Sequence, residues 1–163
     1  MAVAGEDFGI GRPASPSEIA GWDIDIAPDG KGLPPGRGSV REGEMIFAQK
    51  CASCHGAQGE GKPMDRLSGG SGTIKAATPI KTVGSYWPYA TTLFDFVRRA
   101  MPFNAPQSLS PSEVYAVSAY VLFLNQLVSN DAILDAKSLP RVAMPNRNAF
   151  VSGYKPDPRA SRN

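Results

Sequence analysis

The sequence has few of the residues that bind metals or form disulfide bridges: two cysteines and one histidine among 163 residues. A structural zinc site needs four ligands, so cysteine and histidine alone cannot complete one here. The chain also has no run of 18 or more apolar residues, which predicts that it has no membrane span. Its net charge of +2 is too small for a nucleic-acid-binding surface, so we expect no nucleic-acid partner.

Glycine and proline are frequent, with 17 and 15 residues, and many of them lie toward the two ends of the chain. Both residue types interrupt regular elements. We therefore predict an irregular N-terminal arm over residues 1–38, a compact domain over residues 39–129 and an irregular C-terminal arm over residues 130–163. Within the first arm, a Ser-Pro-Ser-Glu capping box predicts one or two helical turns over residues 16–20.

Apolar residues at helical spacing predict three longer helices in the central part of the chain. They are expected over residues 39–50, over residues 91–100, and from a second Ser-Pro-Ser-Glu capping box to about residue 128. The second helix is expected to end at Met101, because the residue before a proline disfavours the helical conformation. No strand-like run stands out in the chain.

Both cysteines and the only histidine lie in one five-residue segment, Cys51-Ala52-Ser53-Cys54-His55. This Cys-x-x-Cys-His pattern is typical of covalent haem c attachment through Cys51 and Cys54, with His55 as an axial iron ligand. A thioredoxin-like dithiol would be expected at the start of a helix in a βαβ unit, whereas here a helix precedes the motif. A disulfide between the two cysteines is geometrically possible but gives His55 no role.

The second axial ligand of such a haem cannot be a histidine or a thiolate, because none is left, and methionine is the natural choice. Met64, Met101 and Met144 are the methionines from which it can come. We favour Met101, because it ends a predicted helix and begins the loop that precedes the last helix. For Met144 the alternative is a role in packing.

Three aromatic residues, Tyr86, Trp87 and Tyr89, flank Pro88 shortly before the second long helix. This segment is too aromatic for a solvent-exposed loop. We predict that it lines the haem pocket, where an indole N–H or a phenol can bind a haem propionate. Ordinary packing in the core is the equally acceptable alternative.

A helix before Cys-x-x-Cys-His, a Met-Pro loop and a final amphipathic helix together resemble the class I cytochromes c. The resemblance implies an all-α class I cytochrome c fold around one mostly buried covalent haem, with one edge exposed for electron transfer. In that family the first and last helices cross where a small residue faces an aromatic one. Here Gly43 or Phe47 is expected to meet Tyr120.

Further segments resemble SoxD, the cytochrome subunit family of the sulfane (or sulfite) dehydrogenases of bacterial thiosulfate oxidation. They cover residues 8–13, 21–25, 30–36, 83–90, 99–103 and 144–147. The resemblance implies an electron-transfer subunit that accepts electrons from a molybdenum-cofactor subunit, where the sulfur oxidation takes place, and passes them to a mobile cytochrome or other acceptor. Some members have a second Cys-x-x-Cys-His, which is absent here.

Two other functions fit the same motif. One is a free-standing periplasmic electron carrier without a fixed partner. The other is a haem peroxidase, which needs an open iron position and is disfavoured by a methionine ligand. Haem attachment and the resemblance both imply the periplasm, although the residues after Met1 show no export signal.

Overall fold

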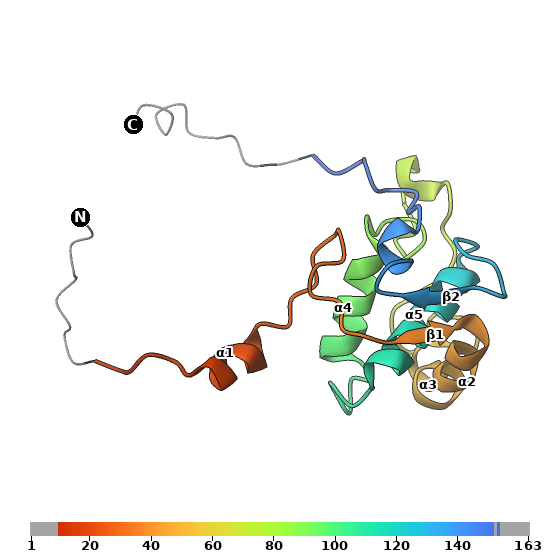
Figure 1. Ribbon diagram of the computed structural model, residues 1–163. Coiled ribbons are helices and arrows are strands. Elements are labelled where there is room, and N and C mark those ends of the chain that lie inside the picture. The colour runs from red at the N-terminus through yellow and green to blue at the C-terminus, as the bar shows by residue number, and fades with distance from the viewer. Residues whose placement is uncertain (1–9, 152, 154–163) are drawn as a thin grey trace, which may run out of the picture.

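The computed structural model describes residues 10–151 and 153 and shows a mostly helical chain (Figure 1). The elements, in order, are α1 (Pro16–Trp22), β1 (Arg37–Ser39), α2 (Val40–Lys50), α3 (Ala52–His55), the 3₁₀ helix η1 (Thr73–Lys75), α4 (Ala90–Ala100), α5 (Pro111–Leu124), β2 (Ile133–Asp135) and the 3₁₀ helix η2 (Leu139–Arg141). The predicted helices are therefore present, and α5 ends four residues before its expected end at about residue 128. The first nine residues, residue 152 and residues 154–163, which belong to the two predicted arms, lie outside the described residues.

Capping boxes begin three of the helices, and two of these boxes were predicted. At α5, the Ser110 hydroxyl accepts a hydrogen bond from the Glu113 amide at 3.3 Å, and the Ser110 amide donates to the Glu113 carboxylate at 2.8 Å. The same pair of bonds occurs at α1 and, unpredicted, at α2. Each box satisfies backbone groups that a helix end leaves unpaired, which explains why these helices begin at a serine.

The core centres on the crossing of α2 and α5. A Cβ atom added to Gly43 would lie 1.9 Å from the carbonyl oxygen of Ala116 and 2.8 Å from Cβ of Tyr120. The rings of Phe47 and Tyr120 pack beside this contact with their centroids 5.3 Å apart. The expected meeting of a small residue and an aromatic residue is thus confirmed, and only glycine allows this approach.

A two-stranded antiparallel sheet adds to the helices and was not predicted. Strand β1 pairs with β2 so that Gly38 lies opposite Leu134. From β2 onward the chain contributes the buried side chains of Leu134, Leu139 and Met144 to the core. The strands have three residues each and no alternating apolar pattern, which explains why the sequence alone indicated no sheet. The division of the chain at residues 38 and 129 stays a prediction.

The residues between α1 and β1 lie on the helical body. The Tyr115 hydroxyl of α5 donates to the Pro34 carbonyl at 2.9 Å, and the Thr91 hydroxyl of α4 donates to the Pro28 carbonyl at 3.4 Å. In contrast, α1 has no buried residue and stands apart from the other helices (Figure 1). Among the described residues, no helix has both the length and the apolar character needed to cross a membrane.

Replacement of Gly43 by alanine should destabilise the protein strongly. The new methyl group would overlap the Ala116 carbonyl, and overpacking of this kind costs about 1–3 kcal/mol. The free energy of unfolding from guanidinium titration measures the loss. Gly21→Ala is the matched control, because nothing lies within 4 Å of that position. Equal effects of the two substitutions would contradict the close helix crossing.

Removal of the α5 cap by Ser110→Ala should lower the free energy of unfolding by about 1 kcal/mol at neutral pH. The bonds from Ser110 hold the pKa of Glu113 below its ordinary value. The cap is therefore fully effective above the unfolded glutamate pKa of about 4.3 and weakens as the pH falls through the lower folded pKa. Denaturation at neutral pH and at about pH 3 should show the difference between variant and parent shrinking. Ser15→Ala, in a helix with no buried residue, should leave global stability unchanged at both pH values.

Candidate haem attachment site

The Cys-x-x-Cys-His motif lies where α2 runs into α3. The Cys51 amide donates to the Phe47 carbonyl at 2.9 Å and thereby closes α2, while the Cys51 carbonyl accepts from the amides of Cys54 at 3.1 Å and His55 at 3.0 Å. Residues three and four apart lie on the same side of a helical turn. This single turn therefore keeps Cys54 and His55 next to Cys51.

Cys51 and Cys54 are both free and partly buried. Burial raises the pKa of the Cys51 thiol to about 11, and the nearby Lys50 ammonium offsets this only in part. A redox-active dithiol needs a lowered pKa, because the thiolate is the nucleophile. The environment of Cys51 therefore argues against the thioredoxin-like alternative.

The His55 ring is held by a single backbone carbonyl. Its Nδ1 lies 2.7 Å from the carbonyl oxygen of Asp65. A carbonyl can only accept a hydrogen bond, so Nδ1 carries a proton and donates it, and in the neutral tautomer this leaves the lone pair on Nε2 for a metal. Metal-binding histidines are typically oriented in this way. Asp65 had no signal in the sequence, because the group involved is its backbone carbonyl.

The loop after His55 folds back onto the motif. The Gly61 amide donates to the His55 carbonyl at 2.7 Å, and the Met64 amide donates to the Cys54 carbonyl at 2.9 Å. Gly56 ends α3 with φ +82°, a conformation that favours glycine. The chain can therefore leave the motif sharply and return with the Asp65 carbonyl facing His55.

The three candidate methionines lie in different environments. Met101 follows α4 and is half-buried against the same hydrophobic core as Cys51 and Trp87. Met64 is 54% exposed, whereas Met144 is only 4% exposed and belongs to the core. The packing alternative therefore describes Met144, and the role of Met101 as an iron ligand stays a prediction.

The aromatic residues before α4 contact two different parts of the chain: Trp87 contacts α4, and the two tyrosines contact the C-terminal segment. Trp87 packs edge-on against Phe96 of α4, which was not predicted, with the ring centroids 5.8 Å apart. Tyr86 packs instead against Phe150, at 5.3 Å, and the guanidinium of Arg147 lies over the Tyr89 ring at 5.4 Å. The C-terminal segment thus contacts both tyrosine rings. Their predicted contacts with haem stay predictions, as does that of Trp87.

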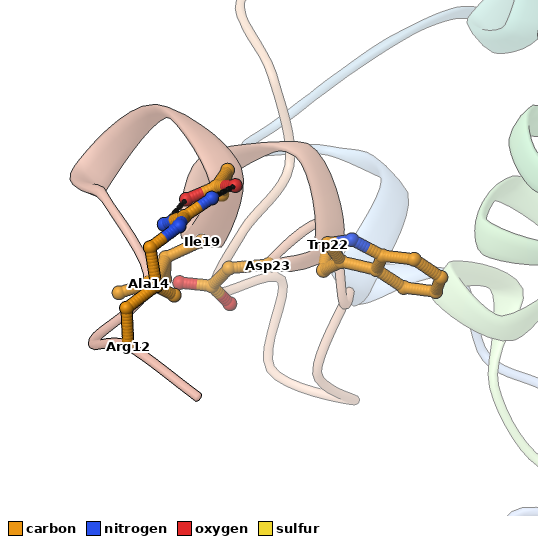
Figure 2. Close-up of a pocket in the computed structure, with 6 residues that line it drawn as sticks. Arg12, Ala14, Ile19, Trp22 and Asp23 are labelled. Carbon is orange, nitrogen blue, oxygen red and sulfur yellow. Dashed lines mark hydrogen bonds and ion pairs between the residues drawn. The ribbon is translucent and has the colours of Figure 1, made fainter. Parts of the chain in front are cut away.

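A hollow on the surface lies away from the motif, on the N-terminal segment (Figure 2). It is lined by Arg12, Ala14, Glu18, Ile19, Trp22 and Asp23. Arg12 donates to the Glu18 carboxylate at 2.8 Å, and this bond, together with those from Ser15, holds the pKa of Glu18 at about 2. None of the lining residues belongs to the motif. Within the part of the chain that the structure describes, no three His, Cys, Asp or Glu side chains gather into a metal site.

Comparison with known proteins gives three matches. Residues 38–121 match the family model described as cytochrome c oxidase, cbb3-type, subunit III. The crystal structure of the sulfane dehydrogenase SoxCD from Paracoccus pantotrophus contains a similar chain, with 44% identity, a TM-score of 0.83, and coverage of 95% of this chain and 75% of that one. A thiosulfate dehydrogenase from Psychrobacter arcticus is 31% identical over 108 residues, which cover 61% of this chain and only 31% of that protein.

Proposed function

The chain belongs to the c-type cytochromes, and from this membership we propose that it carries one haem c bound covalently through Cys51 and Cys54, with His55 and Met101 as axial ligands. The observation that carries the proposal is the single turn that holds the partly buried Cys51 and Cys54 next to an imidazole whose Nδ1 is bound to the Asp65 carbonyl. These donors fit the needs of a c-type haem. When bound, the haem takes up and releases one electron at a time.

Residues of this chain would determine the ligation of the iron, its reduction potential and the access of water to it. The Asp65 carbonyl orients His55 and makes its imidazole a stronger donor to the metal. Met101 would supply a thioether, which raises the reduction potential compared with harder ligands. The half-buried positions of Met101 and Trp87 against the core would limit the access of water to the site. Together these features favour an electron carrier over a peroxidase, which needs an open iron position.

We propose that the chain is the electron-transfer subunit of a sulfane dehydrogenase of the SoxCD type and acts in the periplasm. Its similarity to a chain of that enzyme supports this, at 44% identity over 95% of this chain. The partner would be a molybdenum-cofactor subunit that oxidises the sulfur substrate. The chain would remove the electrons and pass them to a mobile cytochrome or another acceptor.

The segment around α1 is proposed to bind the partner subunit. Trp22 is 87% exposed and Ile19 is 54% exposed, although large apolar side chains usually find cover within a chain. A seven-residue helix without buried contacts has little stability of its own beyond its cap and the Arg12–Glu18 ion pair. The match to SoxCD leaves only 5% of this chain uncovered, so it extends beyond the helical body toward this segment. Exposed tryptophans are typical anchors of interfaces.

Replacement of Met101 by alanine should abolish the weak absorption band at the red end of the visible spectrum that reports methionine–iron ligation. The band should be present in the oxidised parent protein and in the control Met64→Ala, since Met64 is largely exposed. Spectra of oxidised and reduced protein, with a pyridine haemochrome assay for covalent haem, provide the measurement. Absence of covalent haem from the parent, or persistence of the band in Met101→Ala, would contradict the proposed site.

Reduction of the chain by its partner tests the proposed function. The purified molybdenum-cofactor subunit, supplied with a sulfane-sulfur substrate, should reduce the haem of this chain. At low protein concentration, Trp22→Ala should slow this reduction by about tenfold or more, because it removes an interface anchor. Ile133→Ala is the control: Ile133 is 57% exposed but lies on β2 of the body. No reduction of the parent would overturn the sulfane dehydrogenase assignment, and equal rates for the two variants would overturn the role of α1.

A further inference from the structure

Asn125, directly after α5, binds the loop that follows the Cys-x-x-Cys-His motif. Its Nδ2 donates to the carbonyl oxygens of Leu67 at 3.0 Å and Val121 at 2.8 Å, and its Oδ1 accepts from the Gly69 amide at 3.1 Å. Leu67 and Gly69 precede Asn125 by 58 and 56 residues. One side-chain amide thus joins the end of the last helix to the loop on which the His55 contact depends.

The backbone at Gly84 also restricts the position of the Asn125 amide. A Cβ atom added to Gly84 would lie 2.3 Å from Oδ1 of Asn125. The turn that leads to the aromatic segment therefore packs directly onto the amide. Since all three hydrogen bonds and this contact act on the same group, its orientation is fixed.

The bonds made by Asn125 act close to the carbonyl that holds His55. Leu67 is two residues beyond Asp65, and its amide donates to the Gly59 carbonyl at 2.8 Å. The Ser68 hydroxyl donates to the Gln58 carbonyl at 2.6 Å. The loop is thus closed on itself near the motif, and Asn125 attaches this closed loop to α5.

We propose that Asn125 is a positioning residue for His55. By holding the Leu67 carbonyl and the Gly69 amide, it fixes the backbone that presents the Asp65 carbonyl to Nδ1 of His55, 2.7 Å away. This inference rests on the proposed ligation of haem iron by His55. Without Asn125 the loop would keep its internal bonds and its apolar contacts but lose its hydrogen bonds to the end of α5, so the Asp65 carbonyl would move relative to the imidazole.

Exchange of the His55 Nδ1 proton with solvent reports this hydrogen bond. The chain has one histidine, so the holoprotein with ¹⁵N-labelled histidine gives a single set of ring signals in NMR spectra of the reduced state. In Asn125→Ala, exchange of the Nδ1 proton should accelerate by roughly tenfold. This is the effect expected if the hydrogen bond between His55 and the Asp65 carbonyl is lost. Asn125→Asp keeps an acceptor for Gly69 but no donor for Leu67, and should fall between the parent and Asn125→Ala.

Tyr115→Phe is the matched control, since it removes another side-chain-to-backbone hydrogen bond of α5, the one to Pro34. It should lower stability while leaving exchange at His55 within about twofold of the parent. If exchange in Asn125→Ala also stays within that range, Asn125 is only structural and the proposal is overturned. Should Asn125→Ala fail to fold, Asn125→Asp is judged by the same criterion. A parent protein without covalent haem would overturn the proposed function instead, and its visible spectrum reveals this before any variant is compared.

Discussion

The close approach of α2 and α5 is the constraint on which the rest of the structure depends. At Gly43 the two helices come so near that any side chain would overlap the Ala116 carbonyl. The contact fixes the position of α2 relative to α5, because packed helices have few alternative arrangements at such a short separation. Since α2 runs directly into Cys51 and α5 ends just before Asn125, the same crossing decides where the motif lies and which residue can hold the loop behind it.

Local backbone hydrogen bonds and long-range tertiary contacts together determine the geometry of the proposed haem site. The turn from Cys51 to His55 is fixed by hydrogen bonds between near neighbours, so the spacing of the thiols and the imidazole is a local property of the sequence. The direction of the imidazole depends on Asp65, ten residues away, and the loop that carries Asp65 depends on Asn125, more than fifty residues away. Covalent attachment would locate the haem, whereas tertiary contacts set how well His55 serves it.

The sequence was informative where a residue type has a single local consequence. Ser-x-x-Glu boxes predicted the starts of α1 and α5, and the resemblance to class I cytochromes c predicted the contact of Phe47 with Tyr120. It was uninformative where a backbone group acts, as at Asp65, because any residue can supply a carbonyl. It was misleading at Asn125, which lies in an apolar run that continues the helical pattern; three hydrogen bonds hold its side chain just beyond the last helical residue.

Composition alone could not separate the two parts of the N-terminal segment. Both are rich in glycine and proline, yet the carbonyls of Pro28 and Pro34 find donors on α4 and α5. Among the described residues, the interactions that stabilise α1 are its own cap and the Arg12–Glu18 pair. Whether a glycine- and proline-rich segment packs on the body depends on hydrogen-bond donors such as the Thr91 and Tyr115 hydroxyls. These donors come into position only when the helices have folded. The indole of Trp22 is therefore exposed because it lies before the part of the segment that packs on the helical body. An exposed apolar side chain of this size is typical of a surface that a second protein covers.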